Sequence, residues 1–381
     1  MSGIFRNWWP VFAALLLIQL GNGLTGSLVS VAGEARGYPP LLQGMILSAF
    51  FAGSMAGAAL TPMLIRRTTH ARAAGTFTLA LAVTTLGFAM SSEPWVWVII
   101  RMLAGAAITG MFVTVESWLN LSIADGVRAR VFSAYIFIQL TGLVSGQLLL
   151  AGRSAGETAL FLVSAGAIAI AALCFRSGRT AHPPPGEARH IAFLALAGRA
   201  PLGMTCIALA GFSWAGLMAS GPATLQMLGL SDIDKSLFMA LAVAGGMAAQ
   251  LPVGWMADHM DRSRVLLLLT ATAALAAAIP LVGEGRVALF SAAIGYGAAT
   301  LPLYAIGVAR VSEVLGQDER TAAAAWMIIL FNIGAVASPL AVANAAAAWG
   351  PLAFFVLMAI PQALFALAVI GQVLSRRRTQ A

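Results

Sequence analysis

The sequence predicts an all-α membrane protein with twelve transmembrane helices in two pseudo-symmetric six-helix bundles. Of its 381 residues, 60% are hydrophobic and only 9% are charged, whereas about a quarter of the residues of a soluble domain are charged. Apolar runs also recur along the chain, each close to the ~20 residues that a helix needs to cross a bilayer. This combination is typical of a polytopic membrane protein.

Twelve apolar runs follow one another, separated mostly by short polar turns. The first run is too long for the apolar core of a cleavable signal and is expected to be the first span. The expected spans are residues 8–32, 41–65, 72–91, 95–119, 129–151, 156–176, 201–226, 236–257, 264–282, 286–309, 321–344 and 350–374.

The longest connection divides the spans into two groups of six. We therefore expect an N-terminal bundle of residues 1–176, a cytoplasmic linker of residues 177–200 and a C-terminal bundle of residues 201–381. The ends of the second and eighth spans support this repeat, because each has a glycine followed about nine positions later by arginines. Two repeated halves with a substrate site between them are typical of alternating-access transporters.

Basic residues are distributed unevenly between the connections. On the side of the N-terminus they are Arg6, Arg66, Arg67, Arg72, Arg128, Arg130, Arg176, Arg179, Arg189, Arg199, Arg262, Arg264, Arg310, Arg320 and Arg376 to Arg378. On the other side they are Arg36, Arg153, Lys235 and Arg286. Because positive charge collects in cytoplasmic loops, both termini are expected in the cytoplasm, in a bacterial-type inner membrane.

The composition disfavours other classes of function. The formal net charge of +8 does not indicate nucleic-acid binding, because the basic residues lie between apolar runs rather than on one soluble face. No P-loop motif for ATP is present. The four histidines, His70, His182, His190 and His259, lack the spacing of metal ligands. We therefore expect that the protein is not an enzyme and that it binds neither a cofactor nor a metal ion.

The fourth span holds two formal charges, Arg101 and Glu116, in an otherwise apolar run. A charge at membrane depth costs at least ~2.5–3.5 kcal/mol on insertion scales, so it usually has a partner or a function. The two residues are roughly 22 Å apart along a helix and cannot pair. Arg101, near the outer face, would contact an anion or would alter the charge state of a nearby carboxylate. Glu34 is the obvious candidate for this carboxylate. The alternative is a packing arginine bonded to backbone carbonyls.

Glu116, near the cytoplasmic end, has three interpretations. It could form a charge latch with cytoplasmic arginines, which are Arg66, Arg67, Arg128 and Arg130. It could instead bind and release a coupling proton, because an apolar setting raises the pKa of a carboxylate. The third interpretation is an interfacial residue without a specific role.

Two further groups of candidate residues follow from their positions. After the eighth span, Asp258 lies at a helix end, where its carboxylate can pair with the basic residues of the loop. With Gly254, Arg262 and Arg264 it forms a second candidate latch. The alternative is that these charges only set the topology. Polar and aromatic residues within the spans are candidates for a substrate pathway together with Arg101, although hydrogen bonding between helices is the alternative for each. They are Gln19, Asn22, Thr25, Gln139, Trp214, Tyr296, Tyr304 and Asn332.

Several motifs resemble those of the major facilitator superfamily. They are Gly254-x-x-x-Asp258-x-x-x-Arg262-x-Arg264, which is similar to its cytoplasmic signature loop, Arg101-x-x-x-Gly105, similar to its fourth-helix motif, and the glycine and proline pattern of 334–339. The chain further resembles the YcaD-like branch at 115–117, 129–135, 146–149, 250–254 and 301–304. In the first-half copy of the loop, Thr61 and Pro62 stand where the family has its aspartate. This departure favours Glu116 as the replacement in a latch.

The resemblance implies the fold of this superfamily and a transport function. We expect a secondary active transporter that moves a small organic solute by a rocker-switch form of alternating access. The pathway suits a neutral, amphipathic or weakly anionic solute. Proton coupling, a facilitative uniporter and a transporter-like sensor or scaffold stay open as alternatives. The expected partners are the solute and the lipid bilayer, and the chain is expected to act as a monomer.

Overall fold

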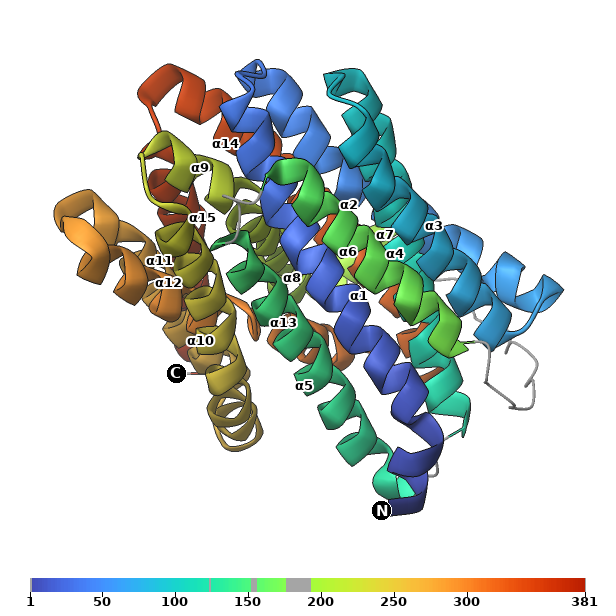
Figure 1. The fold of residues 1–381 in the computed structure, drawn as a ribbon. Coiled ribbons are helices and arrows are strands. Elements are labelled where there is room, and N and C mark those ends of the chain that lie inside the picture. The colour runs from blue at the N-terminus through green and yellow to red at the C-terminus, as the bar shows by residue number, and fades with distance from the viewer. Residues whose placement is uncertain (1, 123–124, 152–155, 176–192, 381) are drawn as a thin grey trace. The chain divides into compact units, whose positions relative to one another are not determined.

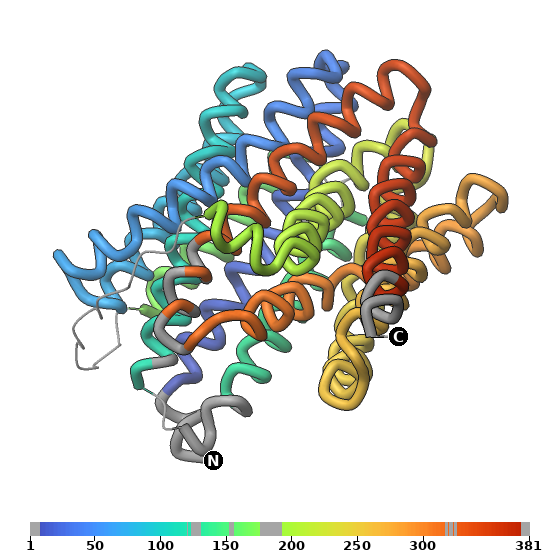
Figure 2. The backbone as a smooth tube through the Cα atoms, turned by 180° about the vertical axis from the view of Figure 1, so that it is seen from behind, coloured from blue at the N-terminus to red at the C-terminus, as the bar shows by residue number. Residues whose placement is uncertain are grey.

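The computed structural model describes residues 2–122, 125–151, 156–175 and 193–380. For the helical residues 2–7, 120, 125–130, 317–318, 320–322, 324–325 and 375–380 it describes the backbone alone. All regular structure within this part of the chain is helical, as Figures 1 and 2 show from opposite sides. The predicted all-α architecture is therefore confirmed.

The first six spans are single helices. They are α1 (Ser2–Ala35), α2 (Pro40–Arg67), α3 (His70–Met90), α4 (Pro94–Ser122), α5 (Asp125–Leu149) and α6 (Glu157–Cys174). A short helix, α7 (Phe193–Arg199), precedes the seventh span. The remaining helices are α8 (Pro201–Ala215), α9 (Gly221–Met227), α10 (Asp232–His259), α11 (Arg262–Val282), α12 (Gly285–Thr300), α13 (Leu303–Ser312), α14 (Gln317–Trp349) and α15 (Ala353–Gln380).

Twelve segments among the described residues are long and apolar enough to cross a membrane. The prediction of twelve spans is therefore confirmed, and most of the expected limits differ by only a few residues. The end of the eleventh span differs most, because it was expected at residue 344 and α14 ends at Trp349. The alanine-rich end of this span is as apolar as its middle, so its end is set instead by Gly350, whose φ of +81° is unfavourable for other residues, and by Pro351.

Two spans of the second half are interrupted. The seventh consists of α8 and α9, joined by a π-helical turn over Gly216–Ser220. The tenth consists of α12 and α13, joined by a turn at Leu301 and Pro302. Proline lacks the backbone N–H that would continue the helix. Interruptions of this kind are tolerated in membranes where neighbouring groups satisfy the freed backbone atoms.

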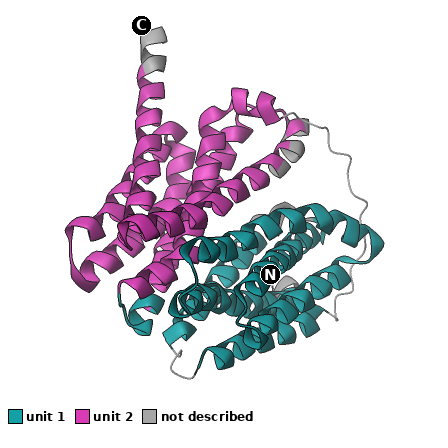
Figure 3. Cartoon of the chain, turned by 90° about the horizontal axis from the view of Figure 1, so that it is seen from above, with its two compact units in different colours: residues 1–185, 229–236 teal, residues 186–228, 237–381 magenta. Residues whose placement is uncertain are grey.

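The chain forms two compact units, coloured separately in Figure 3. Unit 1 consists of residues 1–185 together with residues 229–236, and unit 2 consists of residues 186–228 and 237–381. The short segment 229–236 lies in sequence between α9 and the body of α10, yet it groups with the first half of the chain.

Both units use glycine for their closest helix contacts. In unit 1, a Cβ at Gly105 of α4 would lie 1.8 Å from the carbonyl oxygen of Phe50 in α2. In unit 2, a Cβ at Gly297 of α12 would lie 1.8 Å from the carbonyl oxygen of Ala242 in α10. Only a residue without a side chain allows the backbones to approach this closely, which is the usual way in which helices pack in lipid. The second and fourth spans thus pack like the eighth and tenth.

Candidate functional site

Arg101 is buried inside unit 1, with 4% of its surface exposed. Its guanidinium carbon lies 4.4 Å from the centre of the Phe50 ring, a cation–π contact between α4 and α2. Its Nε atom is buried without a hydrogen-bond partner. No ion pair joins Arg101 to a carboxylate of the described residues, and Glu34 does not neutralise it. The arginine is therefore a buried cation with an aromatic neighbour and no counter-charge in the described part of unit 1.

A second unsatisfied polar group lies at the same depth as Arg101. The helices α1 and α4 run in opposite directions, and the rings of Trp8 and Trp118 meet at 5.1 Å. Thr25 follows Trp8 by 17 residues, and Arg101 precedes Trp118 by 17 residues. Both therefore lie about 26 Å along their helices from this contact. The Oγ1 atom of Thr25 is buried and lacks a partner, so at this level both Thr25 Oγ1 and Arg101 Nε are left without a hydrogen bond.

The other predicted pathway residues of unit 1 have side-chain partners. Asn22 donates a hydrogen bond of 3.3 Å to Gln19 on the same face of α1. Gln139 of α5 is half-buried and lies within hydrogen-bonding reach of Tyr135. They differ in this respect from Arg101 and Thr25, which are the groups with capacity for a ligand.

In unit 2, the predicted pathway residues contact their own helices or neighbouring side chains. Asn332 donates to the carbonyl oxygen of Ile328 one turn earlier, at 2.9 Å. The hydroxyl of the buried Tyr296 lies 3.3 Å from the sulfur of Met358. Tyr304 packs edge-on against Phe331, with ring centres 5.3 Å apart. Trp214 is half-buried on α8.

Glu116 is hydrogen-bonded to a tyrosine of the fifth span. The hydroxyl of Tyr135 donates to Glu116 Oε1 at 2.9 Å. Among the predicted latch partners, Arg66 and Arg67 are exposed at the end of α2, and no contact of either with Glu116 is present among the described side chains. The side chains of Arg128 and Arg130 lie outside the described residues. The charge latch of Glu116 therefore stays a prediction, and Tyr135 is a partner that the sequence interpretation did not assign.

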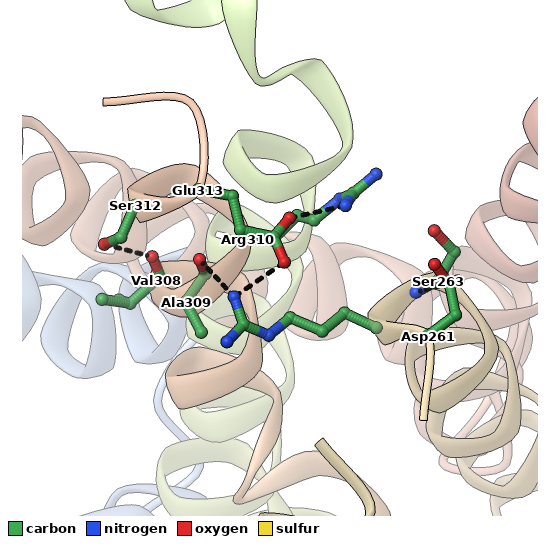
Figure 4. A network of polar contacts seen from close by, with 8 residues as sticks. Asp261, Ser263, Val308, Ala309, Arg310, Ser312 and Glu313 are labelled. Atoms are coloured by element: carbon green, nitrogen blue, oxygen red, sulfur yellow. Dashed lines mark hydrogen bonds and ion pairs between the residues drawn. The ribbon is translucent and has the colours of Figure 1, made fainter. Parts of the chain in front are cut away.

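The predicted signature loop of unit 2 forms a charge network at the ends of α11 and α13 (Figure 4). Arg262 donates to Glu313 at 2.8 Å and to the carbonyl oxygen of Ala309 at 3.0 Å. Arg310 donates to the other carboxylate oxygen of Glu313 at 2.6 Å. Glu313 thus holds together two arginines from different helices.

The acidic residues of the loop itself have separate positions. Asp261 caps the start of α11 by accepting hydrogen bonds from the backbone N–H groups of Ser263 and Arg264, at 2.9 and 3.3 Å. Asp258 is exposed. The partner of Arg262 is therefore Glu313, which lies 51 positions away. The spacing of Arg310 and Glu313, which places both on one helix face, was the available sequence signal for this residue.

A second ion pair anchors the short helix α7 to unit 2. The guanidinium of Arg199 donates to both carboxylate oxygens of Glu319, at 2.8 and 3.0 Å, and also to the carbonyl oxygen of Val314. The hydrogen bonds from Arg199 lower the pKa of Glu319, and a bond from the backbone N–H of Gly316 adds to this effect. Leu196 is fully buried on the inner face of α7.

Known proteins resemble this chain over most of its length. Residues 203–380 match the family model of the Major Facilitator Superfamily. A protein of Yersinia enterocolitica, named as an uncharacterized MFS-type transporter, is 27% identical over 341 residues, which are 89% of this chain and 88% of the relative. The MFS-type transporter YcaD of Escherichia fergusonii is 27% identical over 346 residues, with the same coverage.

Solved transporter structures share the fold. A mutant of the nucleoside transporter NupG has a TM-score of 0.81 at 13% identity, with coverage of 95% of this chain and 98% of NupG. A bacterial homolog of the human lysosomal transporter Spinster has a TM-score of 0.73 at 15% identity, with coverage of 94% and 96%. With its twelve apolar spans the chain is a multi-pass integral membrane protein, and in sequence and fold it resembles the major facilitator superfamily of transporters.

Proposed function

We propose that this protein is a secondary transporter that moves a small organic solute across the cytoplasmic membrane by alternating access. The two bundles, residues 1–176 and 201–381, would rock about a central site, with residues 177–200 as the cytoplasmic linker and with both termini in the cytoplasm. The protein would act as a monomer. Similarity to the superfamily and the absence of a P-loop motif support transport without direct use of ATP.

The observation that carries the proposal is the uncompensated charge of Arg101. A buried guanidinium presents a planar set of donors that fits a carboxylate or phosphate, and a low local dielectric strengthens its attraction for an anion. Among the solutes that the sequence allows, this favours one with an anionic group. The nucleoside in the name of NupG belongs to that protein, because a likeness at 13% identity is one of fold. Nucleosides are therefore only a neutral comparison class for the experiment below.

A ligand screen followed by flux measurements tests this proposal. The purified chain would be melted with a panel of small organic acids, each matched with its neutral amide, and with nucleosides. We expect stabilisation by acids but not by their amides. Hits would then be tested for uptake into proteoliposomes with and without a pH gradient, which separates a proton-coupled transporter from a uniporter. Loss of uptake in R101Q, with partial uptake in R101K, is expected. Equal stabilisation by acids and amides would contradict the role of Arg101.

We further propose that Glu116 acts in gating rather than in proton binding. Its contact with Tyr135 joins the fourth span to the fifth, and the latch with Arg66, Arg67, Arg128 or Arg130 would form in one state of the cycle. E116Q should change the balance of inward-facing and outward-facing states, measured as distances between spin labels, and leave the pH dependence of uptake unchanged. Y135F is the matched control that removes the hydrogen bond and keeps the charge. An altered pH dependence with unchanged distances would instead support proton coupling.

The charge network of unit 2 is proposed as a second gating element. Arg262 and Arg264 belong to the motif that includes Gly254 and Asp258, and Glu313 fixes Arg262 to the end of α13. Such partly exposed pairs are worth roughly 0.2–1 kcal/mol each, which is enough to bias two conformations of nearly equal free energy.

If the protein is a sensor or scaffold, uptake would be absent for every ligand that stabilises it.

A further inference from the structure

A groove lies between α3 and α6 of unit 1, outside the proposed transport pathway. These two helices pack side by side (Figure 1), and the groove lies where α3 begins and α6 ends. Its volume is about 950 Å³. It is lined by Thr68, Thr69, Ala71, Arg72, Gly75, Thr76, Leu79, Ala169, Ala172, Leu173 and Phe175.

The lining changes from polar to apolar along the groove. Arg72 and the threonines lie at the end that is predicted to face the cytoplasm. Leu79 lies seven residues further along α3, about 10 Å deeper in the membrane. Leu79 is 55% exposed. Because Gly75 lies against Ala172 and Phe175, the lining residue Ala169 of α6 lies at about the depth of Leu79, and the deeper part of the groove is apolar on both helices. A polar end at the surface and an apolar end below it match the structure of a phospholipid.

The polar end of the groove carries positive charge. Arg72 is exposed, and among the described residues that line the groove none is a carboxylate. Thr76 lies one helical turn from Arg72 on the same face. The two exposed arginines Arg66 and Arg67 directly precede the groove in the chain. Each arginine near a membrane surface contributes about 1 kcal/mol to the attraction of anionic lipids.

We propose that this groove binds an anionic phospholipid of the inner leaflet. Its phosphate contacts the guanidinium of Arg72, with the hydroxyl of Thr76 beside it, and one acyl chain runs past Leu173 toward Ala169 and Leu79. Charge selects an anionic headgroup, and the apolar lower half selects a lipid over a free phosphate ion. The site is independent of the substrate site and rests on contacts within unit 1 alone.

Native mass spectrometry of the full chain tests this proposal. The protein would be released from nanodiscs that contain equal amounts of dioleoyl phosphatidylglycerol and dioleoyl phosphatidylcholine. We expect retention of phosphatidylglycerol over phosphatidylcholine. R72Q should lower this retention about fivefold, which corresponds to the ~1 kcal/mol of one arginine, and R72K should keep most of it. R264Q is the matched control, because Arg264 is the third residue of α11 as Arg72 is of α3 and lies outside the groove.

A second variant separates the groove from the charge. A Cβ at Gly75 would lie 3.7 Å from the nearest atom, in Phe175, so G75L can place its side chain in the groove without a backbone clash. It should displace the lipid while the net charge stays the same. The proposal would be overturned by unchanged retention in R72Q, by equal retention of both lipids, or by displacement of the lipid by millimolar inorganic phosphate. Crosslinks from a photoreactive residue at position 79 to residues 176–192 instead of lipid would also overturn it.

Discussion

The substitution of Arg101 by methionine is expected to stabilise the protein and to abolish transport. A buried charge without a counter-charge opposes folding, and methionine fills a similar volume without charge. Buried ionic groups that are replaced by apolar residues of similar volume often leave a protein equally stable or more stable. A residue that serves only to pack helices would give the opposite result.

The size of the effect follows from the contacts of Arg101. An arginine at membrane depth costs at least ~2.5–3.5 kcal/mol on insertion scales. The desolvated cation–π contact with Phe50, at 4.4 Å, offsets about 2 kcal/mol of this cost. The remainder, roughly 0.5–1.5 kcal/mol, is the gain expected in R101M. For a unit of this size, a change of 1 kcal/mol shifts the melting temperature by about 2–4 °C.

Tryptophan fluorescence during heating would measure the melting temperature in one detergent for all variants. Arg36 provides the matched control, because it also lies over an aromatic ring, that of Trp97 at 4.8 Å, but is paired with Glu157 at 2.8 Å. R36M should lower the melting temperature, whereas R101M should raise it. If R101M melts several degrees below the native protein, further contacts stabilise the charge of Arg101 in the folded state, and its role as an anion contact loses its basis.

Three further predictions concern other parts of the structure. E313Q breaks two ion pairs, at 2.8 and 2.6 Å, and should cost roughly 0.5–2 kcal/mol in thermal unfolding; E284Q, on an exposed glutamate whose side chain does not cap its helix, should have no effect. G105A forces α4 away from the carbonyl oxygen of Phe50 and should lower the stability of the protein by about 1–3 kcal/mol. The control is G166A, where no atom lies within 4 Å of the new Cβ, and it should be neutral or slightly stabilising in the same assay. The pKa of Glu319 is held below its usual value of 4.5, so its contribution to stability is complete above pH 4.5 and is lost as the pH falls through the lowered value. The difference in melting temperature between the native protein and E319Q should therefore shrink below pH 4.5. A constant difference would contradict the pairing with Arg199.

The sequence was sufficient to predict the spans because their signal is local. A run of about 20 apolar residues must be helical in a bilayer, since no other backbone structure satisfies its own hydrogen bonds there. The interruptions of the seventh and tenth spans were not predicted. Pro302 is a local signal for a break, but the π-helical turn at Gly216–Ser220 depends on how neighbouring helices accommodate it. Its one glycine, Gly216, does not distinguish it from a regular helix.

The partners of the candidate residues were harder to predict than the residues themselves. Arg262 was identified from its motif, but Glu313 lies 51 positions away. Arg199 and Glu319 are 120 positions apart. Pairs of this kind depend on the arrangement of helix ends, which a single sequence does not encode in any periodic pattern. Glu116 illustrates the same limit, because Tyr135 was identified only as part of a family motif.

Close packing around Arg101 explains how an unpaired charge can be kept at this depth. Long basic side chains near helix ends usually reach toward water, and a helix can shift to help them. At Arg101 such a shift is blocked, because a Cβ at Gly53 would lie 1.8 Å from the carbonyl oxygen of Met102, the next residue of α4. Gly105, one turn further along, makes an equally close contact with α2. The backbone of α4 is therefore held against α2 by close contacts on either side of the level of Arg101. A binding group that is already ordered loses little entropy when its ligand arrives, so the same packing that prevents escape of the charge prepares it for an anion.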